Sequence, residues 1–149
     1  MIPSLTALSL RSQPTGRNVW DHRHFLELEE VIEDGLNLEY TAEDIRDDRA
    51  IVLVAVAQNG EALQFASPRL KDDEKVVRTA TRQWGPAFQF ASERLRGDRE
   101  FVLSLLQDPT ISGFGVSQLL RHASEPLRDD REVVLAAVSK HGFNLEFAS

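Results

Sequence analysis

The chain has 149 residues, a net charge of −7 and no cysteine. This length suits one domain with a continuous core. The negative charge argues against sequence-independent binding to nucleic acid, because that binding requires Lys and Arg to displace counterions from phosphates. Without cysteine there is no disulfide framework, thiolate nucleophile or cysteine-based metal site. No apolar stretch approaches the roughly 20 residues of a membrane span.

Residues 1–20 differ from the rest of the chain, since they contain no acidic residue and two arginines. Three interpretations stay open. The segment is a flexible leader, or an organelle-targeting peptide, which is typically rich in Arg and Ser and poor in acid, or an extended arm that docks on another protein subunit. In the third case the contact residues are apolar: Ile2, Leu5, Leu8, Leu10 and Trp20.

After Trp20 the chain repeats one phrase, in the versions LEYTAEDIRDD, LQFASPRLKDD, FQFASERLRGD and a closing LEFAS. An apolar run begins at each of Asp48, Asp73, Asp98 and Asp130, and the first two steps are 25 residues. The third step carries an insertion. We expect five units, near 21–42, 43–67, 68–92, 93–124 and 125–149. A fixed period of this length predicts a solenoid-like array in which each unit buries its apolar face against its neighbours.

Within each unit, apolar positions spaced by two, three and five residues predict a buried helix. The preceding Asp suits its N-cap, and the following Gly suits the left-handed position after its end. A second, shorter helix should follow, and Ser67, Ser92 and Ser124 could each cap one more short turn. IVLVAV and EVVLAAV could also be strands of a β/α array, but Ala inside the runs and charged residues before them favour helix. The expected fold is all-α: about five helix–turn–short-helix repeats of 25 residues, with an extended N-terminal arm.

Residues 46–67 (RDDRAIVLVAVAQNGEALQFAS) and 128–149 (RDDREVVLAAVSKHGFNLEFAS) resemble the domain-of-unknown-function 4116 repeat, a helical repeat of protists and algae. Residues 71–92 match less closely, because Arg78 and Thr79 interrupt the apolar run. The resemblance implies a helical architecture. It carries over no activity and no catalytic residue.

The Asp pairs 47–48, 72–73 and 129–130 are the obvious acid candidates, yet they recur where each helix needs a cap, whereas a catalytic site is normally unique. The histidines do not share one helix face, and no HExxH, GxSxG or phosphate-loop motif occurs. We therefore expect no enzyme activity, no cofactor and no metal site.

Two irregular places are candidate contacts with a partner. The insertion 108–120 (DPTISGFGVSQLL) reads as a Gly-containing loop, and insertions in solenoids often carry binding. Ile111, Phe114 and Val116 are then exposed contact residues, although Phe114 could instead cover the core. Trp84 lies in a turn, where it either forms a contact hot spot or closes the edge of the core.

The sequence thus favours a non-catalytic scaffold or accessory subunit that binds other protein subunits. Its acid-poor leader and the family's distribution make an organellar, photosynthetic assembly a special case of this hypothesis. The alternative is a cytosolic ligand-binding or adaptor module that uses the groove between repeats.

Overall fold

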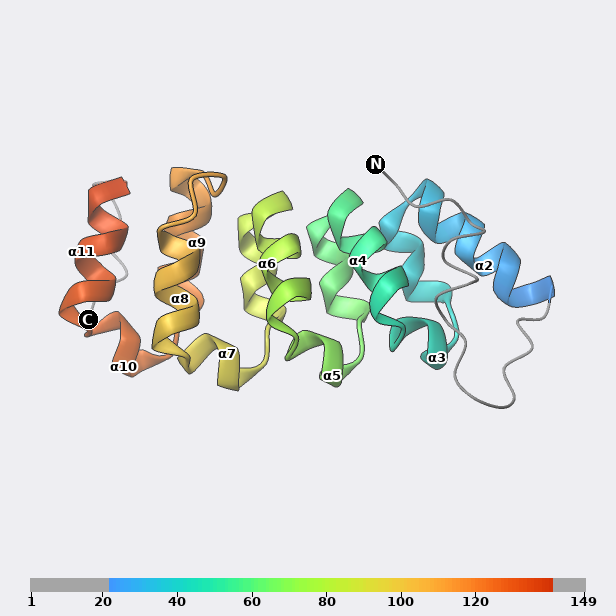
Figure 1. Cartoon of the computed structure of the whole chain (residues 1–149), viewed down its shortest axis with the longest axis horizontal. Coiled ribbons are helices and arrows are strands. Elements are labelled where there is room, and N and C mark those ends of the chain that lie inside the picture. Colours follow the sequence, from blue (N-terminus) through green and yellow to red (C-terminus); the bar gives the residue numbers. More distant parts are fainter. Residues whose placement is uncertain (1–21, 141–149) are drawn as a thin grey trace.

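The computed structural model describes residues 22–140, and in that range the chain consists of helices packed in a row, without a strand (Figure 1). The all-α prediction is confirmed. The long first helices of the units are α2 (His22–Glu33), α4 (Arg49–Gln58), α6 (Glu74–Gln83), α8 (Arg99–Leu106) and α11 (Arg131–Lys140). The second helices are the 3₁₀ helices η1 (Gly35–Tyr40), η2 (Gly60–Phe65) and η3 (Gly85–Phe90), and the α-helix α9 (Gly113–His122). The short third helices are α3 (Glu43–Arg46), α5 (Pro68–Lys71), α7 (Glu93–Gly97) and α10 (Glu125–Arg128).

The second Asp of each pair starts a first helix, as the sequence predicts. One carboxylate oxygen of Asp48 accepts hydrogen bonds from the backbone N–H groups of Ala50 (2.8 Å) and Ile51 (3.2 Å). These bonds satisfy donors that would otherwise have no partner inside the helix. The equivalent caps are Asp73, Asp98 and Asp130.

The recurrent glycine has another role than the one predicted. None of Gly35, Gly60 and Gly85 has a left-handed φ, and α4 ends at Asn59 in extended conformation. A Cβ atom on Gly60 would instead lie 2.4 Å from the carbonyl oxygen of Ala80 in the next first helix. The prediction of a left-handed cap is therefore wrong: glycine is needed because the backbones of adjacent units touch there.

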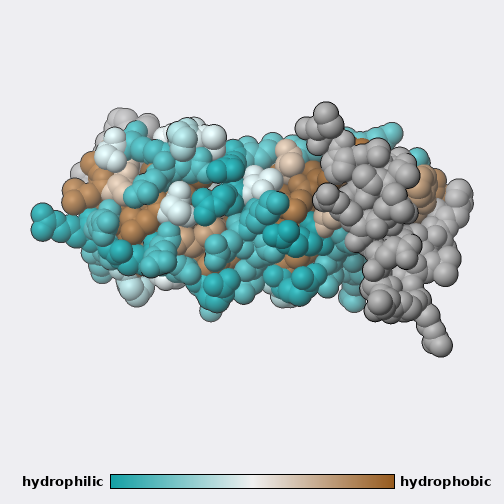
Figure 2. All heavy atoms as spheres, in the orientation of Figure 1, coloured by the Kyte–Doolittle hydropathy of each residue, from teal (hydrophilic) through white to brown (hydrophobic). Residues whose placement is uncertain are grey.

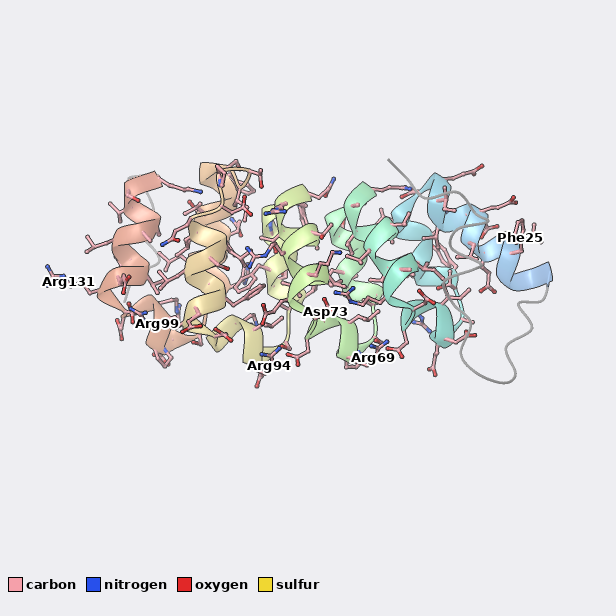
Figure 3. All side chains as sticks on the ribbon, in the orientation of Figure 1. Phe25, Arg69, Asp73, Arg94, Arg99 and Arg131 are labelled. Atoms are coloured by element: carbon pink, nitrogen blue, oxygen red, sulfur yellow. The ribbon has the colours of Figure 1, made fainter. Side chains whose placement is uncertain are left out.

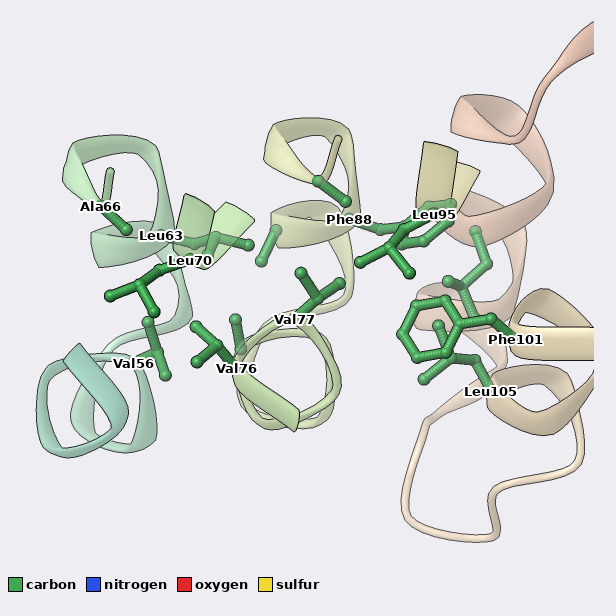
Figure 4. Close-up of a cluster of buried hydrophobic side chains, with 14 of the residues drawn as sticks. Val56, Leu63, Ala66, Leu70, Val76, Val77, Phe88, Leu95, Phe101 and Leu105 are labelled. Carbon is green, nitrogen blue, oxygen red and sulfur yellow. The ribbon is translucent and has the colours of Figure 1, made fainter. Parts of the chain in front are cut away.

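A single apolar cluster has contributions from every unit in the described part of the chain. Figure 4 shows the part of it between Val56 and Leu105. At the same position of the repeat, each second helix in the described residues places a large, fully buried side chain in the cluster: Leu38, Leu63, Phe88 and Leu120. The third helices add Ile45, Leu70, Leu95 and Leu127. Burying one such side chain stabilises the fold by about 1.5–3 kcal/mol, so the third helices are part of the core.

The insertion is a helix, contrary to the expected loop. Only residues 107–112 link α8 to α9, and α9 replaces the six-residue 3₁₀ helix of the first three units with ten residues of α-helix. Ile111 and Val116 are 4% and 0% exposed. The expectation that they are exposed is wrong, because α9 places Val116 in the core and Ile111, in the link before α9, is buried as well. In residues 22–140, no helix is long and apolar enough to cross a membrane.

Candidate functional site

Consecutive third helices meet at junctions that hold the array together. At the α3–α5 junction, the Ser67 backbone N–H donates to the carbonyl oxygen of Arg46 at 2.9 Å. The same bond joins Ser92 to Lys71 at the α5–α7 junction. Ser124 and Arg96 form it at the α7–α10 junction, also at 2.9 Å. Each junction therefore brings a serine of one unit against a basic residue of the preceding unit.

Asp47 and Asp72, the first members of two Asp pairs, belong to these junctions and do not cap the start of a first helix. The Asp47 carboxylate accepts hydrogen bonds from the Ser67 hydroxyl and from the Arg69 guanidinium, the latter at 3.0 Å. These bonds, led by the one from Ser67, lower the pKa of Asp47. The Asp47 carboxylate thus links two units, and the interpretation of the first Asp as a cap for the start of a first helix is wrong for Asp47.

The α5–α7 junction repeats this arrangement. Asp72 accepts from the Ser92 hydroxyl and from Arg94 at 2.9 Å, and the same two bonds lower its pKa. Arg69 and Arg94 lie along the edge of the array formed by the short helices (Figure 3). Because Arg69 and Arg94 are 61% and 54% exposed, the ion pairs themselves add little stability. Their value lies in fixing the register of neighbouring units.

Further ion pairs join the first helices. Arg49 donates to Asp73 at 2.7 Å, and Arg99 donates to Asp130 at 2.9 Å and also to Glu132. The hydrogen bond from Arg49 lowers the pKa of Asp73. The face in Figure 2 is correspondingly hydrophilic, with apolar residues in separate patches.

The α7–α10 junction departs from this pattern. Gly97 stands where Asp47 and Asp72 stand, and Pro126 stands where Arg69 and Arg94 stand. The carboxylate and its arginine partner are thus both missing. The Ser124 side chain makes no capping hydrogen bond, whereas those of Ser67 and Ser92 do. This junction keeps the backbone hydrogen bond from Ser124 to Arg96, without the carboxylate and the arginine of the regular junctions.

A groove shows what surrounds the carboxylate in a regular junction. At the α3–α5 junction it is lined by Arg46, Asp47, Phe65 and Ser67, among others. The residues at equivalent positions of the α7–α10 junction are Arg96, Gly97, His122 and Ser124. The irregular junction therefore keeps the cation and the hydroxyl, loses the carboxylate and gains an imidazole.

The Arg96 and His122 side chains of this junction are partly buried. The Nε atom of Arg96 is buried and has no hydrogen-bond partner. Burial lowers the pKa of His122, and the nearby charges of Arg121 and Arg96 lower it further. A hydroxyl, a guanidinium and an imidazole can each donate a hydrogen bond to an anion.

The predicted contact residues are not brought together. Phe114, on the first turn of α9, is 62% exposed. Trp84 is half-buried between α6 and η3, and its ring stacks on that of Phe90 at 6.5 Å between centroids. Ile111 and Val116 lie in the core, where a partner cannot reach them. Leu5, Leu8, Leu10 and Trp20 lie outside the described residues.

Two other departures from the repeat are structural. Arg78, in an otherwise apolar column, donates to the Ser104 hydroxyl at 2.7 Å and lies over the Phe101 ring at 5.3 Å. Thr81 is buried and donates to the carbonyl oxygen of Val77. Neither side chain lines the groove described above. Among residues 22–140, no group of three His, Asp or Glu side chains could hold a metal ion.

Sequence reasoning missed the α7–α10 junction because it treated both aspartates as caps. A signal was present: Gly97 interrupts the Asp column where Pro126 interrupts the Arg column. A paired loss of this kind indicates that the two columns contact each other in the regular units.

A family model described as "Domain of unknown function (DUF4116)" matches the chain three times, over residues 29–71, 73–114 and 111–149. Searches of the curated proteins and of the solved structures found no match. The three matches cover most of the chain and follow the repeat seen in the fold. The chain therefore belongs to the family of proteins that carry the domain of unknown function DUF4116 as a tandem repeat.

Proposed function

We propose that this protein is a non-catalytic interaction scaffold, an accessory subunit that binds other protein subunits of a larger assembly. The observation that carries the proposal is the use of the polar side chains. The aspartates of the repeat cap helices or join units, and their arginine partners join units. Residues committed to holding the array are poor candidates for acid–base chemistry, which needs a group free to exchange its proton.

The exposed apolar side chains support the same proposal. Five large apolar residues of the described chain stay exposed after folding: Phe25, Leu26, Tyr40, Phe114 and Leu135. Phe114 lies on α9, which is the one second helix that departs from the 3₁₀ form in the described units. An exposed aromatic residue on a rigid helix is a typical anchor of a protein contact.

The test is to purify the full chain, tagged at its C-terminus, from the organism that encodes it, and to identify what accompanies it. Two variants are compared with it: a chain that lacks residues 1–19, and Phe114→Ala. The proposal expects a defined complex that the truncation or the substitution weakens. Leu135→Ala removes another exposed apolar side chain and tests whether the contact is confined to α9. A lone monomer in every case contradicts the proposal. A partner set from a plastid or mitochondrion would support the organellar special case.

A second candidate function is a ligand-binding or adaptor module in the cytosol. The groove at the α3–α5 junction favours it, since Phe65 and Ala66 there lie beside the charged Arg46 and Asp47. This candidate expects a small molecule to be retained by the purified monomer. Mass spectrometry of the native protein before and after denaturation detects such a molecule.

A further inference from the structure

The two regular junctions define where a carboxylate fits between units. At each of them an aspartate oxygen accepts a hydrogen bond from the serine hydroxyl of the next unit, Ser67 or Ser92. The groove around Asp47 also contains Arg46. The array therefore provides, at a fixed position in each regular junction, a place shaped for one carboxylate.

Gly97 supplies no carboxylate at the α7–α10 junction, and its position is exposed. A Cβ atom on Gly97 would lie 3.6 Å from the Ser124 hydroxyl oxygen and 3.8 Å from its Cβ, at ordinary contact distance. No other heavy atom of the described residues lies within 4 Å of that position, apart from the flanking residues and the helix's own backbone. The Ser124 backbone N–H is already used by Arg96. The donors that remain for a ligand are therefore side chains.

Three side chains of the α7–α10 junction can donate to an anion. They are the Ser124 hydroxyl, which makes no capping bond, the Arg96 guanidinium and the His122 imidazole. Arg46 and Arg128 also have a buried Nε atom without a partner, so the basic column alone does not distinguish this junction. Gly97 and His122 do. A partly buried guanidinium without its full set of hydrogen bonds gains when an oxyanion completes them.

We propose that the α7–α10 junction binds a carboxylate of a partner protein, the side chain of an Asp or Glu, at the position that Asp47 and Asp72 occupy in the regular junctions. This inference rests on the proposed function, because it names the chemistry of one contact. A carboxylate is favoured over a phosphate since the regular junctions hold a carboxylate there. The net charge of −7 also repels a dianion more strongly than a monoanion.

The test is an NMR titration of the ¹⁵N-labelled full chain with N-acetyl-aspartate N-methylamide at constant ionic strength. The neutral N-acetyl-asparagine N-methylamide is the control probe. We expect saturable shifts of the Gly97 and Ser124 amides and of the His122 imidazole with the aspartate probe only. Gly97→Asp supplies an internal carboxylate, so it should weaken binding by about tenfold or more. Gly97→Ala is the matched control, because it adds the Cβ atom without a carboxylate and should keep the affinity.

Three results would overturn the inference: equal shifts with the asparagine probe, unchanged binding in Gly97→Asp, or tighter binding of inorganic phosphate than of the aspartate probe. Urea unfolding of the two Gly97 variants serves as the check that both of them fold. Purification of tagged Gly97→Asp from the native source separates the two proposals. A complex that survives this substitution leaves the scaffold function standing and overturns the contact at this junction. Absence of any complex with the unmodified chain contradicts the scaffold function, whatever the titration shows.

Discussion

At the scale of single residues, the same residue type serves different purposes at different positions of the repeat. Asp48 caps a helix, whereas its neighbour Asp47 reaches the next unit. Gly60 is required because the backbone of Ala80 lies against it, whereas at Gly97 an added Cβ atom would meet only the Ser124 side chain, at ordinary contact distance. Local sequence gives the residue type in each of these cases. The neighbouring unit gives its role.

Gly60→Ala should destabilise the protein, because the added methyl group would lie 2.4 Å from the Ala80 carbonyl oxygen and 2.9 Å from the Trp84 Cβ atom. Because the Ala80 carbonyl group belongs to the backbone, a change of side-chain rotamer cannot relieve this contact. We expect a loss of about 1–3 kcal/mol in the free energy of unfolding, measured with urea. Gly97→Ala is the control and should be neutral or slightly stabilising. Equal effects of the two substitutions would contradict the role assigned to Gly60.

At the scale of secondary-structure elements, α9 shows how an insertion can be absorbed by the core. The first three units use a six-residue 3₁₀ helix as second helix, and this unit uses ten residues of α-helix. Ile111 and Val116 pack inside, and Leu119 and Leu120 are fully buried. Gly115 allows η3 to approach α9 closely, since a Cβ atom on Gly85 would lie 2.4 Å from the Gly115 Cα atom. The added length therefore enlarges the core, and of the three predicted contact residues only Phe114 stays exposed.

Ile111→Ala and Phe114→Ala should change the stability of the protein by very different amounts. Ile111 is 4% exposed, so its truncation leaves a cavity and should cost about 2–5 kcal/mol. Phe114 is 62% exposed, and its truncation should change stability by about 0.5 kcal/mol or less. Thermal or urea unfolding of the two variants measures both values. A small effect of Ile111→Ala would mean that the segment before α9 is a surface loop after all.

At the scale of the whole molecule, carboxylates tie successive units together. Asp108 is the most buried of them, at 5% exposed. Burial raises its pKa, but hydrogen bonds from Thr110 and Arg82 overcome that effect and lower the pKa to about 2. Asp47, Asp72 and Asp73 also have lowered pKa values, led by bonds from Ser67, Ser92 and Arg49 respectively.

Stability should therefore fall in acid. A carboxyl group whose pKa is lower in the folded than in the unfolded chain stabilises the fold above its unfolded pKa, and this contribution is lost as the pH falls through the folded pKa. For Asp108 the window extends from about pH 5 down to about pH 2, and the contribution at neutral pH is about 2 kcal/mol. Urea unfolding at pH 7 and pH 3 measures the loss. Asp108→Asn should lower stability at pH 7 and flatten the dependence on pH; an unaltered slope would contradict this assignment.

Much of the array could be predicted from the sequence because the signals are local and recur in every unit. The second Asp of each pair predicted the start of a first helix, and the apolar spacing predicted helix in place of strand. Ser67 and Ser92 predicted the third helices, which they cap. A wrong prediction for one unit would have disagreed with the pattern of residues in the other units.

What the sequence by itself determined is the helical content, the period and the helix starts, since caps and apolar spacing act within one unit. Only the tertiary structure decided what lies between units: Gly60 against Ala80, Asp47 bonded to Ser67, and α9 packed into the core. The α7–α10 junction belongs to this second group. This junction differs from the regular ones because Gly97 and Pro126, far apart in sequence, replace an aspartate and an arginine that bond to each other there. Contacts between units depend on how the backbones of adjacent units stack, and no local propensity encodes the distance between those backbones.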